Sequence, residues 1–164
     1  MGVLYFFIEP VDAPRGGPKF SYRREDFVEF NEKEAGTMSY VDGWVLVVPQ
    51  GQLKAYKKMA KEGGKMWKQF GALEYFECAG DDLVPEMGGM KPSLTFPKMT
   101  RLKEGETVIF AFAVYKSKAH RNQVNAKVMK EMAKTPEGQK EMAMPFDIKR
   151  TAWAGFSTIV EERP

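Results

Sequence analysis

The chain has 164 residues, of which 43% are hydrophobic and 29% are charged, and its formal net charge at pH 7 is +3. This length and composition suit one globular domain with a hydrophobic core and exclude a disordered polymer. One cysteine excludes an internal disulfide, and one cysteine with one histidine argues against a zinc site. The apolar runs are too short to cross a bilayer, so we expect a cytoplasmic protein without a membrane segment.

The chain divides at Met38. Residues 38–164 carry regular apolar patterns and form the single expected domain, whereas residues 1–37 read as an N-terminal extension. The extension is either an added strand or arm, or a segment that is not natively translated. Lys33 and Glu34 can be encoded as AAG-GAG, a ribosome-binding sequence at a suitable distance from Met38. Met38 is therefore the favoured native start, and the N-terminal mass of the native protein decides between the two alternatives.

The first half of the domain predicts a strand, a helix and a second strand. The first strand covers residues 40–48 and ends before Pro49. Helical periodicity follows over residues 52–70, and Gly71 stands where a helix commonly ends. Residues 73–79 alternate as the second strand.

The second half of the domain repeats the order strand, helix, strand. A long connection rich in Gly, Pro and Met comes first, with a short edge strand expected near residues 94–96. Residues 107–115 alternate as the third strand, and Ser117 is predicted to cap a helix over residues 118–134. The last predicted strand covers residues 152–160.

The order β-α-β-β-α-β predicts a ferredoxin-like α+β sandwich, an antiparallel sheet with two helices on one face. The third strand is apolar on both sides, with Phe110 and Phe112 pointing one way and Ala111 and Tyr115 the other. Two helices cover only one face, so the second face needs another cover. We therefore expect a homodimer that packs through its open sheet faces.

The chain resembles the YbaA-like family of small bacterial proteins in four segments, YVDGWVLVVP, GALEYFECAGDD, KEGETVIFAFAVYKSKAHRNQVNAKVM and MPFDIKR. The resemblance runs over residues 40–160 and implies a dimeric α+β barrel. It implies no activity, because the family is one of unknown function without established catalytic residues. The chain departs from the family pattern in its N-terminal extension and in the insert PEMGGMKPSLT after Asp82.

The helix predicted over residues 118–134 places polar side chains on its core-facing stripe. Arg121 and Asn125 fall on that stripe, Ser117 precedes them, and His120 lies on the flank. In one interpretation they line a ligand pocket between helix and sheet, with Arg121 holding an anion and His120 acting as acid or base. In the other, Arg121 pairs with a strand carboxylate, Ser117 caps the helix and Asn125 holds a loop. Both interpretations are open.

Two strand carboxylates, Asp42 and Glu77, are the candidate partners of Arg121. With His120, they are also the candidate acid–base groups. Asp42 interrupts an apolar strand, where aspartate is disfavoured, so it either lines a cavity or faces solvent at a sheet edge. The same choice applies to Glu77.

Trp67 and Tyr115 are the expected apolar walls of the pocket. Gly63 and Gly64 lie near Trp67 inside a predicted helix, where each glycine lowers stability by about 1 kcal/mol relative to alanine. Close packing on the sheet explains such a pair, and so does a gap for a ligand beneath Trp67.

Lysines cover the outer faces of both predicted helices. They form either a solvated surface or a grip on a polyanion. The run from Phe110 to Tyr115 is also similar to the aromatic RNA-stacking motif, although it lacks the preceding basic residue and glycine. RNA or polyanion binding is therefore the second functional hypothesis. The lysines are Lys54, Lys57, Lys58, Lys61, Lys65, Lys68, Lys127, Lys130 and Lys134.

The leading hypothesis is a small, partly apolar ligand bound between helix and sheet, with proton transfer as the chemistry that such a pocket allows. We expect no metal and no cofactor, because Asp81 and Asp82 are typical of a turn and no further ligands lie in register with them. The sequence assigns no reaction and does not decide whether the protein is an enzyme.

Overall fold

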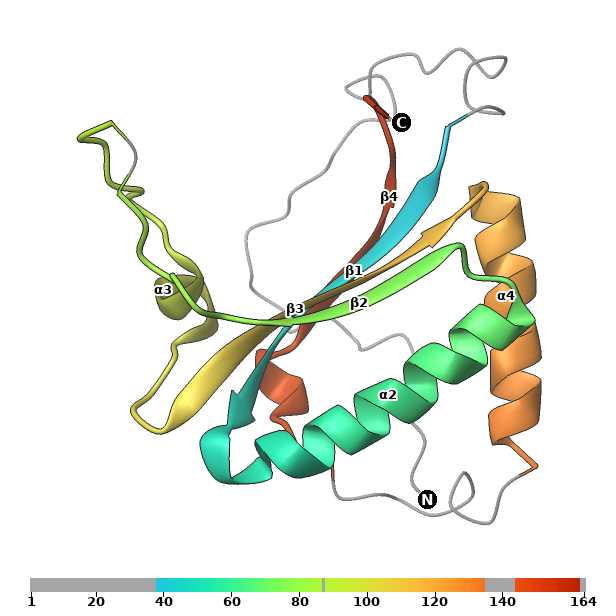
Figure 1. Cartoon of the computed structure of the whole chain (residues 1–164), viewed down its shortest axis with the longest axis horizontal. Coiled ribbons are helices and arrows are strands. Elements are labelled where there is room, and N and C mark those ends of the chain that lie inside the picture. Colours follow the sequence, from blue (N-terminus) through green and yellow to red (C-terminus); the bar gives the residue numbers. More distant parts are fainter. Residues whose placement is uncertain (1–37, 87, 135–143, 163–164) are drawn as a thin grey trace, which may run out of the picture.

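Strands β1 (Tyr40–Pro49) and β3 (Glu106–Tyr115) pair antiparallel along their whole length and form the centre of a four-stranded sheet. Strand β2 (Glu74–Ala79) pairs with the outer side of β3, and β4 (Ala152–Ser157) pairs with the outer side of β1. The strand order is β2-β3-β1-β4 (Figure 1). Every pair is antiparallel, as a ferredoxin-like sheet requires.

The computed structural model describes residues 38–86, 88–134 and 144–162. The predictions for residues 1–37, including a native start at Met38, fall outside these residues and stay predictions. Among the described residues, no helix has the length and apolar character needed to cross a bilayer.

Two long helices cover one face of the sheet. Helix α2 (Leu53–Phe70) follows β1 through the short 3-10 turn η2 (Gln50–Gln52), and α4 (Lys118–Met132) follows β3. Figure 1 shows α2 lying across the sheet and α4 crossing near the C-terminal end of α2. The predicted order β-α-β-β-α-β and the α+β class are confirmed.

The edge strand predicted near residues 94–96 is wrong, because this segment leads into a short helix, α3 (Phe96–Thr100). The Thr95 side chain accepts a hydrogen bond from the backbone nitrogen of Lys98, which caps the first turn. Pro97 lies in that turn, where a residue without an N–H donor is tolerated. Local capping therefore overrides the apolar pattern of the segment.

The last strand also ends earlier than predicted, at Ser157 instead of residue 160. Ser157 pairs with Tyr40, the first residue of β1, and β1 is the neighbour of β4 in the sheet. The strand therefore stops where its partner starts.

The core lies between the helices and one face of the sheet. It divides into two clusters, one around Trp67 and one around Tyr56, and Trp44 packs against both. Full burial of one large apolar side chain stabilises the fold by about 1.5–3 kcal/mol. Among the described residues, the largest fully buried side chains of this core are Tyr115, Met132, Val48, Val124 and Val128.

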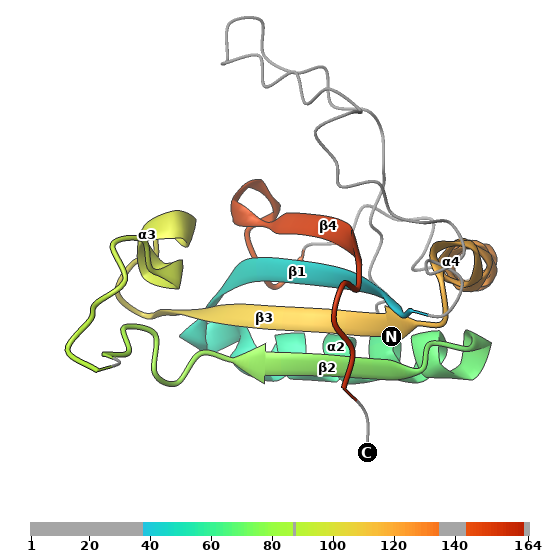
Figure 2. The same ribbon diagram turned by 90° about the horizontal axis from the view of Figure 1, so that it is seen from above.

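The opposite face of the sheet carries exposed aromatic side chains. Phe76, Phe110 and Phe156 have exposed fractions of 46%, 45% and 56%. Phe76 stacks on Phe112 with ring centroids 4.9 Å apart. Helix α3 lies at one end of the sheet, and its Phe96 ring is 6.4 Å from that of Phe110 (Figure 2). We call this surface the open face.

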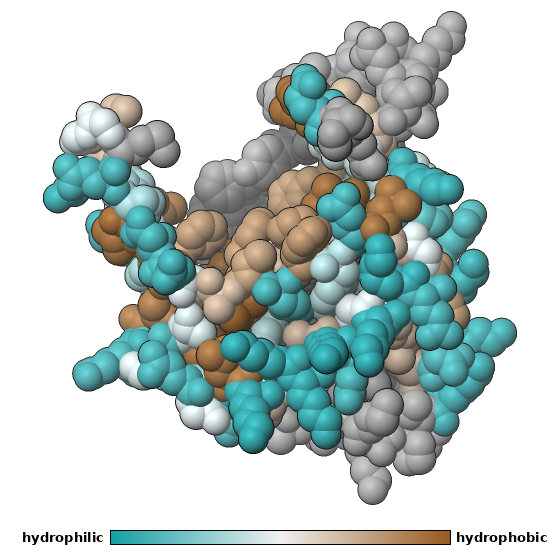
Figure 3. Space-filling view, in the orientation of Figure 1, coloured by the Kyte–Doolittle hydropathy of each residue, from teal (hydrophilic) through white to brown (hydrophobic). Residues whose placement is uncertain are grey.

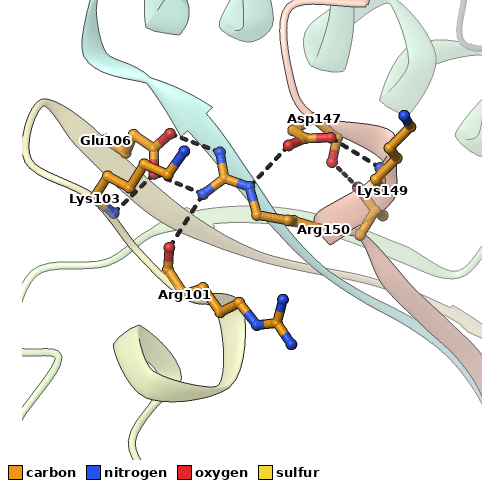
Figure 4. Close-up of polar contacts among 7 residues, drawn as sticks. Arg101, Lys103, Glu106, Asp147, Lys149 and Arg150 are labelled. Carbon is orange, nitrogen blue, oxygen red and sulfur yellow. Dashed lines mark hydrogen bonds and ion pairs between the residues drawn. The ribbon is translucent and has the colours of Figure 1, made fainter.

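An arginine network anchors the 3-10 turn η4 (Ile148–Arg150), which precedes β4, to the start of β3 (Figure 4). Arg150 donates to both carboxylate oxygens of Glu106, at 2.6 and 2.8 Å, and to Asp147 at 2.9 Å. It also donates to the backbone oxygen of Arg101 at 3.3 Å. These charge-assisted bonds from Arg150 lower the pKa of Glu106 to about 2, so the pair is fully charged at neutral pH.

The glycine pair of α2 is explained at Gly64 by close packing against Tyr75. A Cβ atom at Gly64 would lie 2.7 Å from Cδ1 of the Tyr75 ring, closer than van der Waals contact permits. A Cβ atom at Gly63 would lie 3.7 Å from the Tyr75 hydroxyl oxygen, an ordinary contact. The two adjacent positions therefore differ in how they tolerate a methyl group.

We expect Gly64→Ala to destabilise the protein by about 1–3 kcal/mol, because the added methyl group overpacks against Tyr75. Gly63→Ala is the matched control and should be neutral or stabilising by up to about 1 kcal/mol, because alanine favours the helix. Urea unfolding of both variants measures the difference. Equal stabilities of the two variants would contradict the packing explanation.

Candidate functional site

A groove of about 700 Å³ runs between α2 and the edge strand β2. Figure 3 shows the hydrophilic band of α2 facing apolar parts of the surface across a hollow. Leu53, Ala60, Ala79 and Ile109 contribute apolar surface, and Glu77 is the one acidic lining residue. The remaining lining residues are Tyr56, Lys57, Lys61, Gly64, Lys65, Lys68, Gln69 and Tyr75.

Strand alternation and small neighbours place the polar side chains of the groove. Tyr75 and Glu77 are two residues apart on β2, so both point to the helix side of the sheet. They lie opposite Ala113 and Ala111 of β3, whose small side chains leave space above the sheet. Tyr56 fills part of that space from the inner face of α2.

Glu77 accepts hydrogen bonds from two tyrosine hydroxyls. The distances from its carboxylate oxygens are 2.6 Å to Tyr56 and 2.7 Å to Tyr75. Burial raises the pKa of Glu77, and the two hydroxyl donors offset part of that increase. Burial and the neighbouring Glu77 carboxylate raise the pKa values of Tyr56 and Tyr75, so both hydroxyls stay protonated. Glu77 is thus a stronger base than an exposed glutamate.

These three residues, which we call the tyrosine–glutamate cluster, separate the groove from a small inner cavity. The inner cavity has a volume of about 20 Å³, and Tyr56, Tyr75 and Glu77 line both spaces. Its other walls include Trp44 and Trp67. Most of its lining is apolar, and a space of this size holds at most about one water molecule. Glu77 therefore lies in the wall between the groove and the protein interior.

Arg121 lies in a different place, beside β1. Its Nε donates to both carboxylate oxygens of Asp42, at 2.8 and 2.9 Å, and the Asp42 side chain is only 7% exposed. The guanidinium also lies over the Tyr40 ring, 5.5 Å from its centroid, and donates to Asn122. Of the two carboxylates that the sequence left open as partners, the structure pairs Arg121 with Asp42.

Asn125 links this ion pair to the apolar core. Its side-chain nitrogen donates to Asp42 at 3.4 Å, and its side-chain oxygen accepts from Trp67 at 3.1 Å and from Tyr115 at 3.4 Å. Burial, followed by the nearby Asp42 carboxylate, raises the pKa of Tyr115, so its hydroxyl stays protonated as a donor. We call Asp42, Trp67, Tyr115, Arg121 and Asn125 the α4 polar cluster.

Ser117 and His120 organise the start of α4. The Ser117 hydroxyl accepts from the backbone nitrogen of His120, which is the predicted cap. Nδ1 of His120 accepts from the backbone nitrogen of Lys116, and its ring meets Tyr115 edge-on at 6.3 Å. The imidazole thus closes the turn between β3 and α4.

The structure therefore distributes the predicted site residues over two places. Glu77 lines the groove, whereas Arg121 and Asn125 join Asp42 in the α4 polar cluster. The sequence analysis missed Tyr56 and Tyr75 as groove residues. The signal was available, because Tyr75 shares a strand face with Glu77 and Tyr56 lies on the inner stripe of its helix.

The described residues contain no group of three His, Cys, Asp or Glu side chains arranged to hold a metal ion. Asp81 and Asp82 are both exposed beyond the end of β2.

Residues 39–148 match the model of a family described as a protein of unknown function, DUF1428. The chain belongs to this family. The chain is also 36% identical over 125 residues to the uncharacterized protein YbaA of Escherichia coli K12 and to that of Shigella flexneri. Each alignment covers 76% of this chain and all of the relative. The DUF1428 match includes β1, α2, β2, β3 and α4, which carry the groove and the α4 polar cluster.

A solved structure, a dimeric ferredoxin-like protein from an uncultured marine organism, aligns with this DUF1428 chain at 11% identity and a TM-score of 0.45. The alignment covers 76% of this chain and 99% of that protein.

We expect Arg121→Gln to destabilise the protein by about 3 kcal/mol, because it leaves the Asp42 carboxylate buried without its cation. Adding Asp42→Asn should recover part of that loss, since it removes the unpaired charge. Urea unfolding of the two single variants and the double variant gives the coupling energy.

Lys134→Gln is the control, because it breaks the exposed pair with Glu131 and should change stability by less than about 1 kcal/mol. If Arg121→Gln lowers the free energy of unfolding by no more than Lys134→Gln does, the ion pair with Asp42 does not stabilise the fold.

Proposed function

We propose that the protein binds a small, partly apolar molecule in the groove between α2 and β2. The observation that carries this proposal is a partly buried carboxylate, held by two tyrosine hydroxyls, in the wall of a groove of about 700 Å³. Small-molecule sites commonly have volumes of about 300–1,000 Å³, apolar walls and a few placed polar groups. Leu53, Ala60 and Ile109 supply apolar contact, and Glu77 supplies the acceptor.

Glu77 is the proposed acid–base group of this site. Asp42 is engaged by Arg121, and His120 accepts a backbone hydrogen bond through Nδ1. Glu77 instead lines open space, and burial strengthens it as a base. Proton transfer from a bound molecule to Glu77, without a cofactor, is the chemistry that this wall supports. We assign binding to the groove and give the α4 polar cluster the role of holding α4 on the sheet.

We also propose that the open face is the interface of a homodimer. Exposed phenylalanines come from three of the four strands, β2, β3 and β4, and lie on the side of the sheet that α2 and α4 leave uncovered. A second copy brings the same apolar surface about a two-fold axis, so the two faces complement each other. Such a dimer leaves the groove open, because the groove lies on the helix side.

A second candidate function is binding of RNA or another polyanion through α2. The helix carries six lysines and one glutamate, which favours a negative partner. Binding through these lysines would weaken steeply with salt, whereas binding through the apolar part of the groove would not.

The groove proposal predicts ligands that stabilise the protein against heat. Screening quinones, aromatic alcohols, small acids and nucleotides should yield hits, since a ligand at 100 times its Kd adds about 2.7 kcal/mol of stability. Ala79→Trp should abolish the shift by filling the groove, and Glu77→Gln should weaken ligands that donate a hydrogen bond. Ala55→Trp, which is on α2 but outside the groove lining, should keep the shift. Failure of every class, or hits that survive Ala79→Trp, would overturn the proposal.

The dimer proposal predicts that Phe110→Glu yields monomers, because it puts a charge into the centre of an apolar interface. Sedimentation equilibrium over a range of concentrations measures the change in mass. Val84→Asp is the control, since Val84 is 60% exposed but lies in the connection after β2. A wild-type protein that is monomeric at high concentration would refute the proposed interface.

A further inference from the structure

Three lysines of α2 face the groove without an anionic partner. Lys57, Lys61 and Lys65 line it, and none of them forms an ion pair or hydrogen bond within the described part of the chain. They are four residues apart, so they follow one side of the helix at intervals of about 6 Å. Lys68, the fourth lining lysine, already donates to the backbone oxygen of Leu73.

The groove itself does not neutralise these charges. Glu77 is its one acidic lining residue, and a single carboxylate balances the charge of at most one of the lining lysines. Glu62, the one acid of α2, does not line the groove. The counter-charge must therefore come from solvent or from a ligand.

Helix stability does not explain this charge pattern. Lysines four residues apart repel each other, and α2 has no acidic residue in its first turn to complement the helix dipole. Gln52 provides no side-chain cap either. Residues that break several local helix preferences at once, and that also line a cavity, are typical of functional sites.

From these observations we propose that the groove takes an organic anion with an apolar body. This inference rests on the proposed function, because it names the ligand class of the same groove. The anionic group lies between Lys61 and Lys65, the central pair of the lysine wall. The apolar body packs against Ala60 and Ile109, and a hydroxyl or amide of the ligand donates to Glu77.

The positions of the lysines allow an experiment to distinguish binding of a small anion in the groove from binding of a polyanion along the helix. Lys54 and Lys58 are exposed on the same helix with the same spacing as Lys61 and Lys65, but they do not line the groove. A polyanion lying along α2 would use both pairs, whereas a ligand inside the groove would use only Lys61 and Lys65. Replacing each pair by glutamine changes the net charge equally.

The test is calorimetric titration of the full chain with aromatic and fatty carboxylates, led by 2-naphthoate, and with their uncharged amides. The carboxylate should bind about tenfold more tightly than its amide, because two ammonium groups hold the charge. The double variant Lys61→Gln/Lys65→Gln should lose about that factor for the carboxylate and leave amide binding unchanged. Lys54→Gln/Lys58→Gln should bind the carboxylate as the wild type does.

The other outcomes overturn the inference in distinguishable ways. Equal affinity for acid and amide, with both lost in Ala79→Trp, overturns the anion and leaves the groove as a binding site. Equal weakening by the two lysine pairs overturns it in favour of a polyanion surface. Binding of neither acids nor amides, together with an Ala79→Trp variant that behaves as wild type in the ligand screen, overturns the proposed function and this inference with it.

Discussion

The antiparallel ladder between β1 and β3 is largely apolar on both sides. The packing of the helices and the exposed surface of the sheet both depend on this property. One side carries Leu46, Val48 and Ile109, which α2 buries together with Phe146 from the segment before β4. The other side carries Phe110 and its neighbours, which α2 and α4 do not cover and which Phe96 of the short helix α3 approaches. With both long helices on one face of the sheet, the phenylalanines of the other face stay exposed on the single chain.

The same ladder determines how polar groups on the helix side are accommodated. Asp42 and Glu77 both lie on that face, where a carboxylate without partners is strongly destabilising. Asp42 is neutralised by Arg121 and held by Asn125, which leaves a closed network. Glu77 receives only neutral hydroxyl donors and borders open space, so it keeps an elevated pKa. Two carboxylates on one face therefore acquire different chemical roles from their neighbours.

Small residues in the sheet and in α2 leave the space that the groove occupies. Ala111 and Ala113 lie opposite Glu77 and Tyr75, and Gly64 lets the Tyr75 ring approach the helix backbone. Larger side chains at these three positions would push α2 away from the sheet or fill the space beside β2. Volume, as much as charge, therefore creates the groove and orients the hydroxyls around Glu77.

Several site features were predictable because they follow from periodicity and capping. The polar stripe of α4, the Ser117 cap and the placement of Glu77 beside Tyr75 are of this kind, since each depends on residues close in sequence. The short helix at Phe96 was missed because one hydroxyl and one proline outweighed an apolar pattern. The partner of Arg121 was not predictable, because Asp42 and Glu77 occupy the same sheet face and only their distances from α4 distinguish them.

The sequence by itself determined the order of the elements, the two apolar faces of the central strands and the polar residues that interrupt them. These properties follow from side-chain alternation and helical spacing, which act over a few residues. Only the tertiary structure decided that Arg121 closes on Asp42 and that the cavity opens beside Glu77 and the lysines of α2. Those outcomes depend on how far one helix stands from each strand, and that distance is set by packing between residues far apart in the chain.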